Sequence, residues 1–252
     1  MAADSQRVVL KFGSGILTRS SKRVALDNNQ FEDLVAGVAK LVKEGHRPLV
    51  VSSGAAAAGM MAFGLEERPE DLATLQACCA VGQSRLMHFY ETLFRAHGLS
   101  VAQVLLTNDD FRTPERREYV KSTVERLLTF ENVVPIFNEN DSVSVDELKF
   151  GDNDELSAKI AVLVKADQLM ILTSVDGVQD ESGQLVASAT VDEALRLVRG
   201  EIGEFSTGGM QTKLEAVRMA RAEGIATVIA NGRKAEQLSE LVAGKGIATR
   251  FS

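Results

Sequence analysis

The sequence has little of what marks membrane-spanning or secreted proteins. No apolar run approaches the roughly 20 residues that a bilayer-crossing helix needs. The first residues, MAADSQRVVLKF, lack the apolar centre of a signal peptide. We therefore expect a globular protein of the cytoplasm.

Cysteine is also scarce, with two residues in 252. Cys78 and Cys79 are adjacent in a stretch with a helical pattern, where neighbouring side chains point in different directions. A disulfide between them is therefore not expected. We interpret both as reduced thiols in the core of a cytoplasmic protein.

Basic residues are fewer than acidic residues, and the formal net charge is −7. This balance does not favour a general binder of nucleic acid or of membrane surfaces. It leaves an anionic substrate open, because the local charge decides that. The acidic residues gather in one segment, with seven carboxylates at positions 139, 141, 146, 147, 152, 154 and 155.

Three common catalytic motifs are missing. The first glycine turn does not continue to GxGxxG, because Thr18 stands at the third glycine position, so hydride transfer is poorly supported. Neither GxSxG nor GxxxxGK[ST] occurs. His46, His88 and His97 are expected at helix ends or interiors, which makes a histidine general base a poor candidate.

What is present is an alternation of apolar runs and helical patterns. We expect strands at 7–12, 48–52, 101–106, 133–137, 168–173 and 226–230. Helices are expected at 28–44, after Gly54, at 71–97 with a break near Gly82, at 114–130, up to about 165, and at 210–223. A weaker helix and strand follow, and 107–117 is expected to be a polar loop. The pattern predicts one α/β domain over 1–252, a three-layer αβα sandwich with a mostly parallel central sheet.

Glycine-rich turns follow several of the predicted strands. They are KFGSG at 11–15, SSGA at 52–55, GDND at 151–154 and TGGMQTK at 207–213. In open parallel sheets these turns share one edge, where ligands bind. Glycines let backbone N–H groups approach phosphate oxygens, and Lys11 adds a charge that can stay with a moving phosphoryl group. The alternative is a solvated lysine beside a turn.

The TGGMQTK turn is more specific, because its two glycines lead into a helix whose N-terminus supplies N–H donors and the positive dipole end. Lys213 lies in the first turn of that helix. An ordinary junction with a solvated Lys213 is the alternative.

Carboxylates close to phosphate need a cation between them. Mg²⁺ held by one or two carboxylates and by substrate phosphates is one solution, and a substrate ammonium is another. Asp152 and Glu155 also have the spacing of a helix cap, so Asp152 could serve only that purpose.

These motifs, in this order, resemble those of the amino-acid kinase family. The stretches that carry the resemblance are VLKFGSGIL, VVSSGAAAAG, AVGQSRL, QVLLTNDDF, VVPIFNENDSV, FGDNDELSAKIA and FSTGGMQTKLEAV. AVGQSRL, and NEND followed by GDND, are most particular to members that use ATP to phosphorylate the γ-carboxylate of glutamate, the first step of proline biosynthesis.

The resemblance implies a role for each matching residue. Lys11 and Lys213 would neutralise the transferring phosphoryl group, and Asp154 would organise the site or coordinate Mg²⁺. The glutamate would be held by Ser53, Asp141, Asn153 and Asp152, with Asp141 facing the ammonium. The ATP would be bound by Lys11, Gly13, Thr173, Ser174, Thr207, Gly208, Gly209, Met210, Gln211, Thr212 and Lys213.

The chain departs from the family pattern at two residues. Ser174 stands where the family usually has Asp, and Gln179 where it often has Tyr, which weakens the expected contacts to the nucleotide base. Many relatives that act on glutamate carry a further C-terminal domain of RNA-modification type, and this chain ends at Ser252, so we expect the compact form.

The resemblance also implies feedback inhibition by proline, and we expect a homo-oligomer, either a dimer or a tetramer. Two rivals stay open. One is a sibling kinase that acts on acetylglutamate, aspartate, carbamate or a nucleoside monophosphate. The other is a non-catalytic sensor that binds an amino acid, against which the presence of both Lys11 and Lys213 argues.

Overall fold

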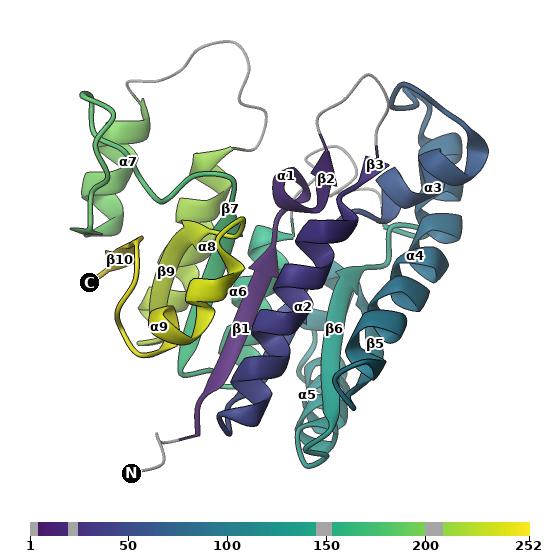
Figure 1. Ribbon diagram of the computed structural model, residues 1–252, viewed down its shortest axis with the longest axis horizontal. Coiled ribbons are helices and arrows are strands. Elements are labelled where there is room, and N and C mark those ends of the chain that lie inside the picture. Colours follow the sequence, from purple (N-terminus) through teal and green to yellow (C-terminus); the bar gives the residue numbers. More distant parts are fainter. Residues whose placement is uncertain (1–4, 20–24, 145–152, 200–208) are drawn as a thin grey trace.

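The computed structural model describes residues 5–19, 25–144, 153–199 and 209–252 (Figure 1). A sheet of eight strands runs through the middle of these residues. Its order is β5 (Ser100–Leu106), β6 (Val133–Glu139), β4 (Arg47–Val51), β1 (Arg7–Phe12), β7 (Gln168–Thr173), β9 (Ala226–Asn231), β10 (Ala248–Phe251) and β8 (Ser188–Ala189). Neighbouring strands are parallel except β9 and β10.

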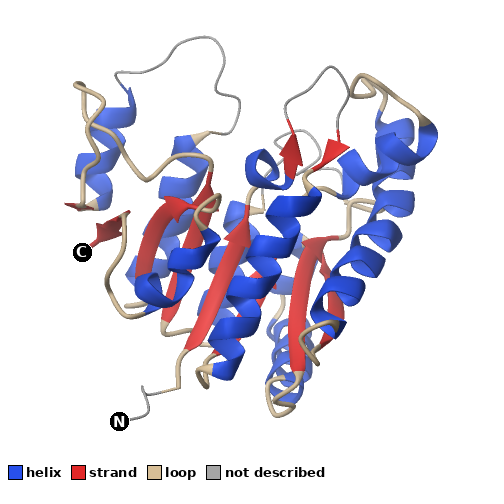
Figure 2. Cartoon of the chain, in the orientation of Figure 1, coloured by secondary structure: helices blue, strands red, loops and turns tan. Residues whose placement is uncertain are grey.

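Helices cover both faces of this sheet, as Figure 2 shows. One face carries α2 (Asn28–Lys43), α4 (Leu72–Arg95) and α9 (Leu238–Val242), and the other carries α5 (Pro114–Leu127), α6 (Asp154–Leu163), α7 (Val191–Arg199) and α8 (Met210–Ala222). Successive strand residues alternate between the faces, so Val8 and Leu10 pack in one apolar cluster and Val9 in the other. The predicted αβα sandwich with a mostly parallel sheet is confirmed.

The predicted break near Gly82 is wrong, because α4 runs through it without interruption. Gly82 instead permits close packing of α4 against α3 (Ala55–Phe63): a Cβ there would lie 1.8 Å from the carbonyl oxygen of Ala55. Gly59 on α3 has the same role, since its Cβ would lie 1.8 Å from the carbonyl oxygen of Cys78. The two helices therefore touch backbone to backbone.

The predicted polar loop at 107–117 is wrong for its first part, whereas the predicted start of a helix at Pro114 is confirmed. A 3₁₀ turn covers Asn108–Phe111, and α5 begins at Pro114. Thr113 caps this helix, because its hydroxyl accepts a hydrogen bond from the backbone N–H of Arg116 at 3.3 Å. The polar residues of this segment are turn formers and caps.

Several elements were not predicted. They are the short α1 (Ser14–Leu17), the β2–β3 pair (Thr18–Arg19 and Ala25–Leu26), β8 and α7. For α7 a signal was present: Thr190 and Glu193 form a capping box, each side chain bonding the backbone N–H of the other. Across the described ranges, no helix is both long and apolar enough to cross a membrane.

Candidate active site

The glycine turns meet at one edge of the sheet. Because β4, β1, β7 and β9 are neighbouring parallel strands, their carboxyl ends lie side by side. The residues that follow them are Ser52 and Ser53, Gly13, Ser174 and Gly232, drawn from distant parts of the sequence. This is the edge where ligands bind in open parallel sheets.

Three buried charges lie at the centre of this edge. The Nζ of Lys11, on β1, lies 2.7 Å from Oδ1 of Asp154, the first residue of α6. The Nζ of Lys213, in the first turn of α8, lies 3.0 Å from Oδ2 of the same carboxylate. Lys11 and Asp154 are each 1% exposed and Lys213 is 9% exposed. Buried charges of this kind persist only when they are paired, so the three side chains fix one another.

The start of α8 is fastened to the same carboxylate. The hydroxyl of Thr212 donates to Oδ2 of Asp154 at 3.0 Å, and the ammonium of Lys213 donates to the carbonyl of Gly209 at 3.1 Å. Within the described part of the chain, no side chain caps this helix. The contacts from Thr212 and Lys213 therefore hold the first turn of α8 against Asp154.

Two ammonium groups and one carboxylate leave the cluster with a net positive charge, which suits an anion such as a phosphoryl group. Both carboxylate oxygens of Asp154 already contact lysines, which favours an organising role for this residue over direct coordination of Mg²⁺. Among the described residues, no group of three or more His, Cys, Asp or Glu could hold a metal ion. The predicted metal role of Asp154 stays a prediction.

Asn153 links the strands on the other side of the cluster. Its Nδ2 donates to the carbonyl of Ser52, at the end of β4, and to Oδ1 of Asn138 on β6 at 2.6 Å. Asn138 in turn donates through its Nδ2 to Oε1 of Gln83 on α4 at 2.8 Å. We did not predict Asn138 and Gln83 as site residues, although both stand inside the NEND and AVGQSRL motifs.

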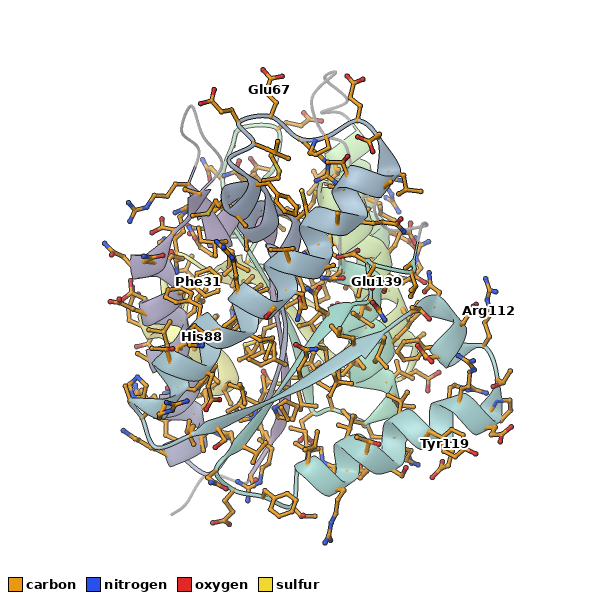
Figure 3. The ribbon with its side chains drawn as sticks, turned by 90° about the vertical axis from the view of Figure 1, so that its right-hand side faces the viewer. Phe31, Glu67, His88, Arg112, Tyr119 and Glu139 are labelled. Atoms are coloured by element: carbon orange, nitrogen blue, oxygen red, sulfur yellow. The ribbon has the colours of Figure 1, made fainter. Side chains whose placement is uncertain are left out.

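A cavity of about 440 Å³ opens beside this network. It is lined by Ala55, Cys79, Ala80, Gln83, Ser84, Met87, Gln103, Leu105, Glu139, Asn140, Asp141 and Ser142. Glu139, the last residue of β6, is labelled in Figure 3. Ala55, which lines the cavity, stands two residues after Ser53, and Ser53 is itself buried. The lining residue Gln83 is linked through Asn138 to Asn153, the residue before Asp154, and the cavity is large enough for an amino acid.

Asp141 is the acidic group with the most perturbed titration in this cavity. Burial raises the pKa of Asp141 to about 6, and a hydrogen bond with Cys79 and the charge of Arg68 act in the opposite direction. Burial also raises the pKa of Glu139. A bound ammonium would favour the charged form of Asp141, which is the physical basis of its predicted role.

Gly13 lies beside the charge cluster. Its N–H donates to the carbonyl of Leu172 at 3.2 Å, and a Cβ at this position would lie 3.6 Å from Nζ of Lys11. The tighter contact of that Cβ would be with the carbonyl oxygen of Leu172, at 3.3 Å. Ser174 is exposed and close by, since a Cβ on Gly15 would lie 4.0 Å from its hydroxyl.

The loops after β7 and β9 are tied together by Asp176. Its Oδ1 accepts hydrogen bonds from Asn231 at 2.9 Å and from Lys234 at 2.7 Å, and the Lys234 contact lowers its pKa. We did not single out Asp176, although it stands two residues after Ser174. Gln179 forms a backbone bridge with Leu185 in a hairpin-like turn.

The structure thus brings most of the predicted residues to one edge. The exceptions are of two kinds. Thr207, Gly208 and Asp152 lie outside the described residues. At the start of α8, Gln211 is exposed, whereas Met210 packs against the apolar cluster behind the sheet.

Comparison with known proteins agrees with this geometry. Residues 6–231 match the model of the amino acid kinase family. The glutamate 5-kinase of Myxococcus xanthus is 44% identical over 98% of this chain and 67% of the relative. That of Symbiobacterium thermophilum is 41% identical over 98% of this chain and 96% of the relative.

Solved structures agree in fold at much lower identity. Carbamate kinase from Giardia lamblia bound to AMP-PNP is 17% identical with a TM-score of 0.66 over 99% of both chains. N-acetylglutamate synthase from Neisseria gonorrhoeae is 16% identical with a TM-score of 0.69, over 98% of this chain and 61% of the other. The chain therefore belongs to the amino acid kinase family and, by sequence identity, groups with its glutamate 5-kinases.

Proposed function

We propose that this chain transfers the γ-phosphoryl group of ATP to the γ-carboxylate of L-glutamate, which yields L-glutamate 5-phosphate for proline biosynthesis. The observation that carries the proposal is the buried Lys11–Asp154–Lys213 cluster, which lies between an amino-acid-sized cavity and the loops after β7 and β9. The similarity to glutamate 5-kinases selects the substrate.

This reaction requires correct positioning of the two substrates and neutralisation of phosphate charge, and it does not require a general base. The γ-carboxylate of glutamate has an ordinary pKa of about 4.3, so it is already ionised at neutral pH. It attacks the γ-phosphorus in line, and ADP leaves on the opposite side. Lys11 and Lys213 stabilise the negative charge on the transferring oxygens, while Asp154 holds both ammonium groups in place.

The amino-acid end of the substrate lies toward the 440 Å³ cavity. Asp141 pairs with the α-ammonium, and Ser53 contributes its hydroxyl. The Nδ2 of Asn153 already donates to Ser52 and Asn138, so this residue contacts glutamate through Oδ1. An N-acetylated substrate has no ammonium for Asp141, which argues against an acetylglutamate kinase.

The nucleotide lies toward the loops after β7 and β9 and the start of α8. Gly13, Thr173, Ser174 and the segment from Thr207 to Lys213 border it, with the N–H groups of α8 directed at its phosphates. A Mg²⁺ ion bound with ATP would neutralise phosphate charge. Asp154 is the carboxylate proposed to lie near it, and Asp152 is proposed to help position the substrate.

Regulation and assembly belong to the same proposal. Proline carries an ammonium and a carboxylate at the spacing of the α-carbon end of glutamate, so it would compete for Asp141. We also propose a cytoplasmic homo-oligomer, a dimer or a tetramer.

A coupled assay of ADP release with a panel of amino acids tests the activity. Glutamate should stimulate release in the presence of Mg²⁺, whereas aspartate, acetylglutamate and carbamate should not. Initial rates at several glutamate concentrations should show competition by proline. If no member of the panel stimulates release, the chain is a sensor rather than a kinase.

A further inference from the structure

We propose that one face of α4 sets the geometry of the amino-acid end of the site through two positioning residues, Cys79 and Gln83. Each residue positions a different polar group at the substrate end of the site. Cys79 interacts with the carboxylate of Asp141, and Gln83 accepts a hydrogen bond from the amide of Asn138. The inference rests on the proposed function, because it assigns a role in the binding of glutamate.

Spacing places both side chains on the same face of the helix. Residues four apart in an α-helix are neighbours on its surface, and Cys79 and Gln83 are four apart. Both line the 440 Å³ cavity together with Asp141. One turn of α4 therefore provides both contacts.

The Gln83 contact extends to the centre of the site. Oε1 of Gln83 accepts from Nδ2 of Asn138 at 2.8 Å, which fixes the orientation of that amide. Oδ1 of Asn138 then accepts from Nδ2 of Asn153 at 2.6 Å and from the N–H of Glu139 at 3.0 Å. Without Gln83, Asn138 loses the partner that keeps its oxygen turned toward Asn153, which is next to Asp154.

The Cys79 contact concerns the acid proposed to bind the ammonium. Cys79 is 3% exposed, and burial raises the pKa of its thiol to about 12, so it stays protonated and can donate at neutral pH. Its hydrogen bond favours the ionised form of Asp141. The charge of Arg68 also favours the ionised form of Asp141, and the charge of Asp141 in turn helps to raise the pKa of Glu139.

The helix that carries these residues is held rigidly. The close approach of α3 and α4 at Gly59 and Gly82 fixes α4 against the helix that follows Ser53. Cys78, the neighbour of Cys79, is fully buried and does not line the cavity. It therefore offers a matched control for the same chemical change.

Steady-state kinetics of four variants test the proposal. Cys79→Ala and Gln83→Met should each raise the KM for glutamate about fivefold, the usual cost of one lost hydrogen bond. The kcat and the KM for ATP should stay close to those of the unaltered protein. Cys79→Ser restores a donor and should recover most of the lost affinity, and Cys78→Ala should change nothing. An unchanged KM in Cys79→Ala and Gln83→Met would overturn the proposal, as would an equal rise in Cys78→Ala.

A carbon-13 NMR titration of the Asp141 carboxyl needs no turnover. Cys79→Ala should raise its pKa above that of the unaltered protein, because the donor to the ionised form is gone. An identical titration would refute the Cys79 contact. If the unaltered protein fails to phosphorylate glutamate, the proposed function fails, whereas this titration still decides whether Cys79 acts on Asp141.

Discussion

Replacement of Asp154 by alanine should both destabilise the protein and remove its activity. The change leaves the ammonium groups of Lys11 and Lys213 buried without the carboxylate that lies 2.7 and 3.0 Å from them. Removing one member of a buried ion pair typically costs about 3–5 kcal/mol. For a chain of this size that corresponds to a fall in Tm of about 10 °C.

Catalysis should fall at the same time. The two lysines lose their common anchor, so the charge that neutralises the phosphoryl group is no longer held in place. The loss of one preorganised contact of this kind typically lowers kcat about a hundredfold, and Asp154→Ala disturbs two.

A matched control separates burial from ion pairing as such. Asp192 lies 3.1 Å from Arg218, a distance similar to that in the buried cluster, but these side chains are 75% and 50% exposed. Asp192→Ala should therefore cost less than about 1 kcal/mol and leave activity unchanged. Differential scanning calorimetry and single-turnover kinetics measure both effects.

The same experiment distinguishes an organiser from a metal ligand. If Asp154 served only to bind Mg²⁺, its removal would leave the melting temperature in excess chelator unchanged or higher, and added Mg²⁺ would partly restore activity. If Asp154 instead anchors the two lysines, Asp154→Ala should lose stability in chelator without any ligand. A melting temperature of Asp154→Ala in chelator that lies within about 2 °C of the unaltered protein would refute this expectation, because such a shift corresponds to only about 1 kcal/mol.

Further predictions concern Lys213, Asp141 and Gly82. Lys213→Ala should lower kcat about a hundredfold with little change in the KM for glutamate, and near-normal kcat in rapid-quench assays would show that Lys213 does not stabilise the transferring phosphoryl group. Asp141→Asn should weaken glutamate binding and spare ATP binding in calorimetric titrations. In the unaltered protein kcat/KM for glutamate should fall as pH drops through about 6, where Asp141 gains its proton. Because the pKa of Asp141 is raised, its ionised form destabilises the folded protein at pH values above that pKa. Asp141→Asn should therefore also raise the melting temperature at pH 8. Gly82→Ala should cost about 3 kcal/mol in chemical denaturation, because its Cβ would lie 1.8 Å from the oxygen of Ala55; a neutral outcome would mean that α3 and α4 can separate.

Local pattern was enough for the longer elements. The predicted strands at 7–12 and 168–173 have the observed bounds of β1 and β7, because each is an apolar run closed by a polar or glycine turn. The helix predicted at 28–44 ends one residue earlier, at Lys43. Elements of two to four residues are too short to show a periodic pattern, so α1, β2, β3 and β8 were missed.

By itself the sequence determined which chemical groups are present and that they follow parallel strands. Lys11, Asp154 and Lys213 were all recognised from glycine turns and family motifs, since each sits at the end of a strand or the start of a helix. The strand ends and turns follow from periodicity and turn chemistry, which are properties of neighbouring residues, whereas the roles of the three residues are what the family resemblance implies.

Only the tertiary structure decided how these groups meet. The family resemblance left Asp154 as either an organiser of the site or a Mg²⁺ ligand, and its position between two buried ammonium groups favours the organising role. The continuity of α4 and the Gln83–Asn138 contact likewise depend on the order of the strands and on the packing of α3 against α4. Such contacts join residues far apart in the chain, and no local pattern contains the distance between them.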